Sequence, residues 1–346
     1  MRHLVFSVLL MLAPCPSLSF EIEAKRIFVA ENERLMLTIL STTDLDLFSD
    51  VITRFQEKNK TISIDYFEVS SSELFKALKD DTTSFDLALS SAMDLQTKIA
   101  NDGLALAYSS EFTERLPEWA HWQNYIFAFT QEAASIVLSA NDFIDLPIPL
   151  SRQELIATIR AYPRRFSGRI GTYDVRSSGL GYLFATQDAR TSETYWRLAE
   201  VMGINGTKLY CCSGKMINDV ISGELAVAYN VLGSYANAQA RLKDDIIIIN
   251  PKDFTTLMLR SALISKKSQS PEIAGKFIDH LISFSLDTNM SKQFPFPTLE
   301  INALKQDTSL RPIKLGPGLL VYLDKLKRQN FIKAWEDATL QTPQDR

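Results

Sequence analysis

Residues 35–58 read LMLTILSTTDLDLFSDVITRFQEK, and this stretch decides the fold class. Its first part, Leu35 to Leu40, is a continuous apolar run that predicts a buried strand. The cluster Ser41-Thr42-Thr43-Asp44 favours the N-cap of a helix, and Leu45 to Lys58 then carries apolar residues at helical spacing. A buried strand that turns directly into a helix is the unit of a parallel sheet flanked by helices.

The same unit recurs along the chain. Further strands are predicted at Ile62 to Val69, Phe85 to Leu89, Gly168 to Tyr173, Thr207 to Tyr210, Leu225 to Tyr229 and Ile246 to Ile249. Further helices are predicted at Ser71 to Lys79, Met93 to Asn101, from Ser177-Ser178-Gly179 onward, Glu193 to Met202, Lys215 to Ser222 with Ser213 as N-cap, around Tyr235 to Leu242, Pro271 to Phe284 and Leu319 to Trp335.

The chain has 346 residues, too many for one compact domain of about 100–200 residues. The apolar stretch Tyr125 to Ala140 suits a strand that passes from one lobe to the next, and Leu257 to Ile264 suits a strand that returns. We therefore predict an α/β fold of two lobes, each a mixed and mainly parallel sheet flanked by helices. Lobe 1 is expected over residues 20–130 and 256–300, and lobe 2 over residues 131–255 and 301–346.

Composition excludes several classes of protein. Apolar residues make up 46% of the chain and charged residues 23%, which are ordinary globular values and exclude disorder, collagen and coiled coil. The 37 basic and 41 acidic residues leave a net charge of −4. Because this charge gives no long-range attraction to a polyanion, we expect no nucleic-acid partner, and any anion must be bound by a local site.

The N-terminus is typical of a secretory signal peptide over residues 1–19. Arg2 precedes the apolar run Leu4 to Ala13, and small residues follow up to Ser19. The run of about ten residues is half the length that a membrane-spanning helix needs. Cys15 raises a lipoprotein alternative, but Pro14 stands where a small residue is expected before a lipid-modified cysteine. We expect cleavage after Ser19 and export to the periplasm.

Only Cys211 and Cys212 remain after cleavage, and they are adjacent in the sequence. Neighbouring cysteines cannot link distant parts of the chain, so stability must come from packing. We interpret them as two small buried residues that close a strand. The alternative is a vicinal dithiol that holds a soft, thiophilic ion such as arsenite.

The motifs of known catalytic chemistry are missing. Histidine occurs only at His3, His121 and His280, and the sequence contains no HExxH, GxSxG, P-loop, CxxC or calcium-loop motif. We therefore expect a protein that is not an enzyme and that carries neither a cofactor nor a metal ion. A secreted phosphoester hydrolase is the alternative of another class, although it would need a metal or an activated nucleophile.

Hydroxyl-rich turns stand where predicted strands pass into helices. Each supplies backbone N–H groups and hydroxyl donors at the positive end of a helix, a combination suited to oxyanions. In an open parallel sheet such turns gather at the carboxyl edge of the strands, where ligands bind. Arg176 adds a planar fork that can hold a carboxylate or phosphate by two hydrogen bonds. The turns are Ser41-Thr42-Thr43, Ser90-Ser91, Ser177-Ser178-Gly179 and Cys212-Ser213-Gly214.

Several stretches together resemble the bacterial extracellular solute-binding proteins of ABC importers. They are Phe166 to Tyr182 (FSGRIGTYDVRSSGLGY), Gly223 to Tyr235 (GELAVAYNVLGSY), the loops Ser41 to Asp44 and Ser90 to Asp94, and Arg311 to Asp324 (RPIKLGPGLLVYLD). The branch they resemble most holds ferric-iron, sugar-phosphate and phosphoglycerate binders. The last stretch is similar to the tail of members that work with sensor kinases.

The resemblance implies a type II periplasmic-binding-protein fold with a ligand cleft between the lobes. Lobe 1 would contact the ligand through Ser41, Thr42, Thr43, Ser90 and Ser91, and lobe 2 through Arg176, Ser177, Ser178, Ser213, Tyr229 and Asn230. Iron-binding members carry adjacent tyrosines where this chain has Tyr229-Asn230-Val231, which disfavours ferric ion and leaves it as an alternative ligand. The serine-rich loops and Arg176 favour a small anionic ligand, namely a phosphorylated or carboxylated metabolite.

Closure around such a ligand would bend the two crossover strands near Thr130 to Ala134 and near Pro251 to Thr256. The closed monomer would then be recognised by ABC permease subunits or by the periplasmic domain of a histidine kinase.

Overall fold

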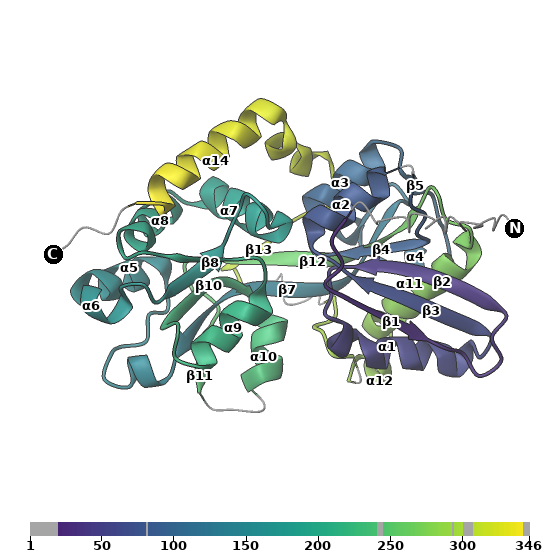
Figure 1. Cartoon of the computed structure of the whole chain (residues 1–346), viewed down its shortest axis with the longest axis horizontal. Helices are drawn as coiled ribbons and strands as arrows, with labels where there is room; N and C mark the ends of the chain where they lie inside the picture. The colour runs from purple at the N-terminus through teal and green to yellow at the C-terminus, as the bar shows by residue number, and fades with distance from the viewer. Residues whose placement is uncertain (1–19, 81, 241–244, 293, 300–306, 342–346) are drawn as a thin grey trace, which may run out of the picture.

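The computed structural model describes residues 20–80, 82–240, 245–292, 294–299 and 307–341. The predicted signal peptide, residues 1–19, lies outside this range. Figure 1 shows two α/β lobes side by side, joined by two long strands, so the predicted fold class is confirmed. In the described part, no helix combines the length and the apolar character that crossing a membrane would require.

Lobe 1 is built on the sheet order β1-β3-β2-β4. Strands β2 (Leu35–Ser41), β3 (Ile62–Glu68) and β4 (Leu87–Ser90) are parallel, and β1 (Ala24–Phe28) pairs antiparallel with β3. Helices α1 (Leu45–Lys58), α2 (Ser71–Lys79) and α3 (Met93–Asn101) follow these strands as predicted, and each begins beside the cleft. The other elements are β5 (Ala105–Leu106), α4 (Glu111–Glu114), η1 (Glu118–Ala120), β6 (His121–Trp122), α11 (Pro271–Leu286) and α12 (Thr288–Ser291).

The lobes are joined by β7 (Ile126–Ser139) and β12 (Thr255–Ser265). These strands pair antiparallel with each other, with Leu257 opposite Ala133 and Ala262 opposite Phe127. The register shifts between Arg260 and Ser261, which bends the pair in its middle. Both crossover strands were expected from the sequence, and the predicted lobe boundaries at residues 130 and 256 fall within them.

Lobe 2 continues the sheet in the order β7-β10-β8-β9. Strands β8 (Ile170–Tyr173), β9 (Lys208–Tyr210) and β10 (Val227–Leu232) are parallel, whereas β10 and β11 (Ile246–Ile249) run antiparallel to β7. The helices are α5 (Arg152–Ala161), α6 (Pro163–Phe166), α7 (Gly179–Thr191), α8 (Thr194–Ile204), α9 (Ser213–Ile221) and α10 (Gly233–Ala240), with η2 (Asn141–Phe143) after β7.

The C-terminal segment contacts both lobes. Strand β13 (Leu310–Pro312) runs parallel to the start of β12, η3 (Pro317–Leu323) lies against α3, and α14 (Lys325–Thr339) lies against α8 (Figure 1). The single helix expected over Leu319 to Trp335 was wrong, because the segment breaks at Asp324. The Asp324 carboxylate accepts the backbone N–H of Lys327 at 3.1 Å and so starts a new helix.

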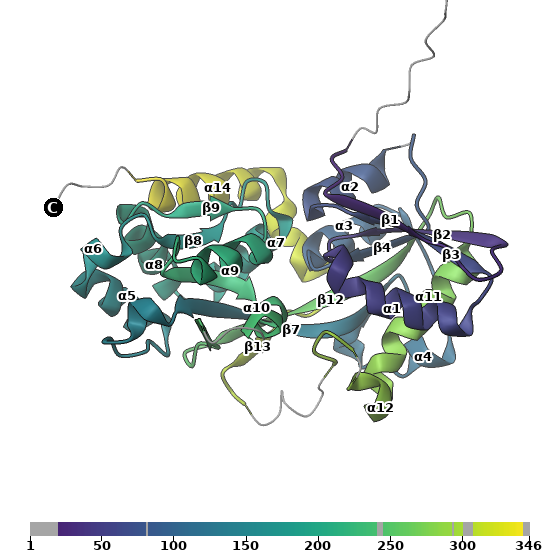
Figure 2. The same ribbon diagram turned by 60° about the horizontal axis from the view of Figure 1, so that its bottom comes forward.

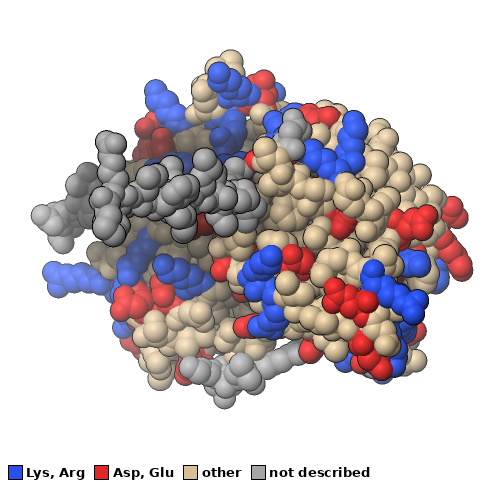
Figure 3. Space-filling view, turned by 45° about the vertical axis from the view of Figure 1, so that its right-hand side comes forward, with Lys and Arg blue, Asp and Glu red and all other residues tan. Residues whose placement is uncertain are grey.

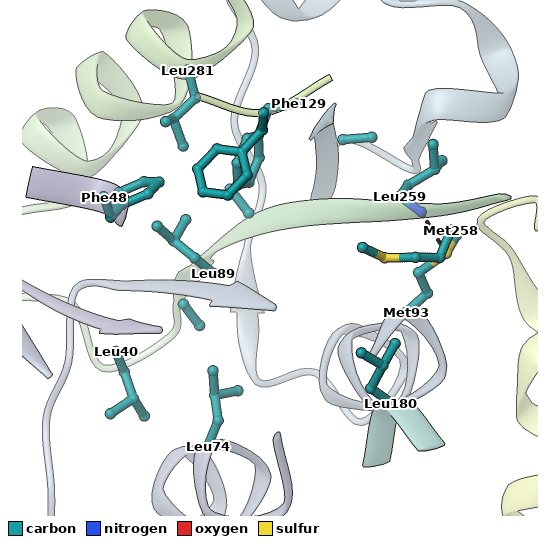
Figure 4. Packing of buried hydrophobic residues seen from close by; sticks show 14 of the residues in the cluster. Leu40, Phe48, Leu74, Leu89, Met93, Phe129, Leu180, Met258, Leu259 and Leu281 are labelled. Atoms are coloured by element: carbon teal, nitrogen blue, oxygen red, sulfur yellow. Dashed lines mark hydrogen bonds between the residues drawn. The ribbon is translucent and has the colours of Figure 1, made fainter. Parts of the chain in front are cut away.

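The hydrophobic core lies between the sheet and its helices. Figure 4 shows Leu89 of β4, Phe48 of α1 and Leu281 of α11 on one side of the sheet, and Leu40 of β2 with Leu74 of α2 on the other. Met93 of α3 lies against Leu259 of β12, whose backbone N–H it contacts at 3.2 Å through its sulfur. All of these side chains are buried. Their packing holds α1 and α3 against the sheet, so that the first residues of both helices lie at the cleft.

Candidate functional site

A cavity of about 1010 Å³ lies between the lobes. Lobe 1 lines it with the first turns of α2 and α3, and lobe 2 lines it with the first turns of α7 and α9. Figures 1 and 2 both show α7 facing α3 across the boundary between the lobes. The predicted cleft between the lobes is therefore present, with helix N-termini on both walls.

The lobes touch across this cavity. Ser72 donates a hydrogen bond to the backbone oxygen of Ser177 at 2.6 Å, and the Tyr235 hydroxyl donates to Asp44 Oδ1 at 2.9 Å. The start of α7 packs so closely that a Cβ at Gly179 would lie 2.7 Å from Ser71 Oγ. Glycine at this position therefore allows the two walls to meet.

The predicted residues of lobe 1 fall into two groups. Thr42 and Ser91 line the cavity, and their hydroxyl groups lie 3.5 Å apart. The other three are buried inside the turns: Ser41 Oγ accepts the N–H of Thr43 at 3.0 Å, and Ser90 Oγ accepts that of Ala92 at 3.1 Å. The Thr43 hydroxyl accepts a hydrogen bond from Arg260. Ser41, Thr43 and Ser90 thus shape the turns and do not line the cavity.

In lobe 2, Arg176, Ser177, Ser178 and Ser213 line the cavity. Ser178 caps α7 by accepting the N–H of Gly181 at 3.1 Å. The prediction of Ser213 as an N-cap was wrong, because Cys212 occupies that position and has no capping hydrogen bond from its side chain. The Ser213 hydroxyl instead bonds with the Tyr173 hydroxyl and accepts the N–H of Leu232 at 2.9 Å. The first turn of α9 therefore meets the cavity without a side-chain cap.

The Arg176 guanidinium already has carboxylate partners. Its Nε and Nη2 donate to the two oxygens of Asp174 at 2.8 and 2.7 Å, and Nη1 lies 3.4 Å from Glu336. This fork lowers the pKa of the Asp174 carboxyl, chiefly through the hydrogen bonds. The structure thus presents Arg176 in an ion pair at the rim of the cavity.

Tyr229 and Asn230 lie away from the cavity, in the interior of lobe 2. The Tyr229 hydroxyl accepts from Arg152 Nε and donates to Asp188, both at 2.7 Å, and Asn230 Nδ2 donates to Asp188 at 2.7 Å. Both side chains are buried, and burial raises the pKa of Tyr229 far above its ordinary value. The placement expected from the resemblance is therefore not observed, because the Arg152–Asp188 ion pair draws these two side chains inward.

The cavity also contains side chains that the sequence prediction did not include, among them Asp44, Asp94 and Arg328. Asp44 and Asp94 stand within the loops that carried the family resemblance, so the sequence held a signal for them. Arg328 stands in a predicted helix close to the C-terminus, and nothing in the sequence connects it with the cleft.

Charge in the cavity is mixed. Burial raises the pKa of Asp94 to about 7, although its carboxylate accepts the N–H of Leu95 at 2.9 Å. Just behind the cavity, burial also raises the pKa of Glu68 to about 7. Among the cations, Lys76 pairs with Glu73 and Lys98 with Asp102. On the outer face that Figure 3 shows, acidic and basic side chains are likewise interspersed.

Cys211 and Cys212 border the cavity at the start of α9. Their sulfur atoms lie 2.6 Å apart, and this contact lowers the pKa of the Cys211 thiol. Cys211 is exposed, so the interpretation of two buried residues was wrong. Within the described residues, no group of three or more His, Cys, Asp or Glu side chains is arranged to hold a metal ion.

A buried ion pair lies on the crossover strands close to the cavity. Arg260 of β12 donates through Nε to Glu132 of β7 at 3.0 Å, and neither side chain is exposed. Arg260 Nη1 reaches Thr43 in lobe 1 at 2.6 Å, while Ser234 of α10 donates to Glu132 from lobe 2. This pair therefore ties both walls of the cleft to the strands that connect them.

The chain belongs to the bacterial extracellular solute-binding proteins, because the model of that family matches residues 83–314. It is similar to the substrate-binding protein of an ABC transporter from Agrobacterium tumefaciens, with 31% identity over 91% of this chain and 98% of the other and a TM-score of 0.87. No curated protein sequence matches it.

Two more distant structures share the fold. The periplasmic binding protein AfuA from Actinobacillus pleuropneumoniae, with exogenous fructose-6-phosphate bound, is 16% identical over 90% of this chain and all (100%) of the other, with a TM-score of 0.72. The ferric binding protein from Campylobacter jejuni is 17% identical over 87% of this chain and 99% of the other, with a TM-score of 0.66.

Proposed function

We propose that this solute-binding protein captures a small anionic metabolite, phosphorylated or carboxylated, in the cavity between its lobes. The observation that carries this proposal is the convergence of helix N-termini from both lobes on one cavity. The positive end of a helix dipole and its free N–H groups favour an anion, and the effect grows when several helices face the same point.

The donors that support this proposal come from opposite walls. Thr42 and Ser91 offer hydroxyl groups from lobe 1, and Ser177 and Ser178 stand at the start of α7 in lobe 2. The first turn of α9 adds backbone N–H groups that no side chain caps. A ligand held by both walls favours the closed form over the open one, and closure would bend β7 and β12.

Ferric ion remains an alternative ligand, but the structure gives it little support. Iron-binding members carry adjacent tyrosines at the position where this chain has Tyr229. Here the Tyr229 hydroxyl is hydrogen bonded to Arg152 and Asp188 inside lobe 2. Cys211 and Cys212 remain candidates for a thiophilic ion. Replacing both with Ser should abolish such binding and leave the binding of an organic anion intact.

Isothermal titration calorimetry tests the proposal with fructose 6-phosphate, 3-phosphoglycerate and citrate, against a ferric complex and arsenite. We expect a phosphorylated or carboxylated compound to bind with one site per chain, and 31P NMR to recover a phosphorylated ligand unchanged, as binding without hydrolysis requires. Binding of the ferric complex alone would contradict the proposal.

A matched pair of variants locates the site. Gly214 lines the cavity, and a Cβ there would meet only Asp44, at 3.7 Å, so the side chain of Gly214→Trp should project into the cavity at the start of α9 and strongly weaken binding. Gly318 has no atom within 4 Å of such a Cβ and does not line the cavity, so Gly318→Trp should bind normally. Equal loss of binding in both variants would argue against the cleft as the site.

We further propose that the closed form is recognised and bound either by ABC permease subunits or by the periplasmic domain of a histidine kinase. Deleting the gene distinguishes the two roles. Loss of uptake of the radiolabelled ligand indicates an importer, whereas loss of ligand-induced transcription with uptake retained indicates a sensor.

A further inference from the structure

The C-terminal segment brings a basic side chain to the cavity. Leu323 at the end of η3 and Arg328 in the first turns of α14 both line it. In Figure 1, α14 extends from α8 of lobe 2 towards α3 of lobe 1. The segment therefore crosses from one lobe to the other along the edge of the cleft.

Packing holds this segment in place. Phe331 lies between the rings of Trp196 and Tyr182, at centroid distances of 5.5 and 5.6 Å, and Trp335 is only 2% exposed. In η3, nine residues before Phe331, the backbone oxygen of Tyr322 accepts a hydrogen bond from the Tyr182 hydroxyl. The position of the first turn of α14 is thus set by α7, the helix whose N-terminus faces the ligand cavity.

Arg328 differs from the other guanidinium group at the cavity. Its side chain makes no hydrogen bond or ion pair with any residue that the structure describes, whereas Arg176 is engaged by Asp174 and Glu336. The Arg328 guanidinium lies 5.2 Å from the centre of the Tyr182 ring, which supports one face and leaves its edge available. Its five N–H donors can therefore be offered to a ligand.

A buried acid stands at the same end of the cavity. Asp94 is 3% exposed and lies near enough to Arg328 for the two charges to interact, yet they form no ion pair within 4 Å. A carboxylate in this position accepts hydrogen bonds from hydroxyl or amino groups. A single ligand could thus place an anionic group against Arg328 and a hydroxyl group against Asp94.

We infer that Arg328, and not Arg176, binds the anionic group of the ligand, and that the Asp94 carboxylate accepts a hydrogen bond from a neighbouring hydroxyl group of the same ligand. This assignment rests on the proposed function and extends it, because it names hydroxylated phosphates and carboxylates as the ligand class. It also makes Arg328 of the C-terminal segment part of the binding site.

Calorimetry with fructose 6-phosphate and inorganic phosphate tests the assignment in the full mature chain. Arg328→Gln is expected to weaken the binding of both probes about 10- to 100-fold, the loss expected for a charge-assisted hydrogen bond. Arg328→Lys should recover part of this loss, since it restores the charge without the fork. Lys327→Gln removes a neighbouring charge that does not line the cavity and should bind as the wild type does.

A second measurement needs no variant. Phenylglyoxal modifies accessible arginines, and peptide mass spectrometry should find Arg328 modified faster than Arg176 and protected by fructose 6-phosphate. Binding that is lost in Arg176→Gln and kept in Arg328→Gln would overturn the assignment and leave the anion cleft standing. If the wild type binds neither of these probes and also binds neither 3-phosphoglycerate nor citrate, the anionic-ligand proposal fails, and the assignment fails with it.

Discussion

Arg260 and Arg152 are both fully buried, yet their partners come from different parts of the fold. Arg260 pairs with Glu132 across the two crossover strands and also contacts Thr43 in lobe 1. Arg152 takes its partners, Asp188 and Asp253, from lobe 2 and from the approach to β12. One buried arginine therefore connects the lobes where they bend, and the other holds a single lobe together.

The difference matters for function because closure has to move one lobe against the other. A buried charge is costly unless it is paired, so each arginine fixes the distance between the elements that supply its partners. We expect the Arg260 pair to restrict the way in which the lobes swing. The Arg152 network, in contrast, should move with lobe 2 as a unit.

The largest expected effect is the loss of Arg260 alone. Arg260→Met leaves the Glu132 carboxylate buried without its cation, and it should lower the free energy of unfolding by about 3–5 kcal/mol. The double variant Arg260→Met/Glu132→Leu removes both charges and should recover most of that loss. Urea denaturation of the three proteins gives these values, and a single variant within about 1 kcal/mol of the wild type would contradict this account.

Arg152→Met should be less costly, about 2–3 kcal/mol in urea denaturation, because Asp188 keeps three neutral donors. These donors are Tyr229, Asn230 and Thr256, at 2.7, 2.7 and 3.0 Å. Small-angle scattering with and without ligand should show normal closure in this variant. If closure is altered in Arg152→Met but normal in Arg260→Met/Glu132→Leu, then the Arg152 network, and not the Arg260 pair, restricts the movement of the lobes.

Asp94, which lines the cavity, should make the stability of the protein depend on pH. Burial raises its pKa to about 7, so the folded protein holds this proton more tightly than the unfolded chain does. Its contribution to stability is therefore present at acid pH and is lost as the pH rises from about 4 to about 7. Asp94→Asn should be more stable than the wild type at pH 8 by roughly 2 kcal/mol, and equally stable near pH 4.

Thermal unfolding between pH 4 and pH 8 checks this expectation. Glu68 also has a pKa raised to about 7 and should keep part of the pH dependence in the Asp94→Asn variant. Glu68→Gln is thus the companion variant, and parallel curves for Asp94→Asn and the wild type would show that Asp94 does not titrate as described.

The smallest expected effect concerns Tyr229. Tyr229→Phe removes two hydrogen bonds inside lobe 2 and should cost about 1–2 kcal/mol of stability. Because the side chain does not line the cavity, ligand affinity should remain unchanged in calorimetry. A tenfold loss of affinity would show that Tyr229 contributes to ligand binding, and that the interior of lobe 2 is not independent of the cleft.

The order and type of most elements were predictable because they depend on local patterns, although strand β1 and helix α5 were not predicted. Helices α1, α2 and α3 begin and end where the spacing of apolar residues and the capping clusters predicted. The break at Asp324 was missed, since apolar residues continue at helical spacing on both sides of it. A single capping carboxylate decided that boundary.

The sequence by itself thus determined the two-lobed α/β fold, the crossover strands and the turns that border the cleft. The tertiary structure decided which polar side chains face the cavity. Thr42 does and Thr43 does not, because Arg260, 217 residues further along the chain, draws Thr43 inward. Arg176 is held by Asp174 and by Glu336, which is 160 residues away, while Arg328 comes to the cleft through the packing of α14 on α7 and α8. Contacts over such separations leave no periodic or spacing signal in the sequence, because they exist only once the chain has folded.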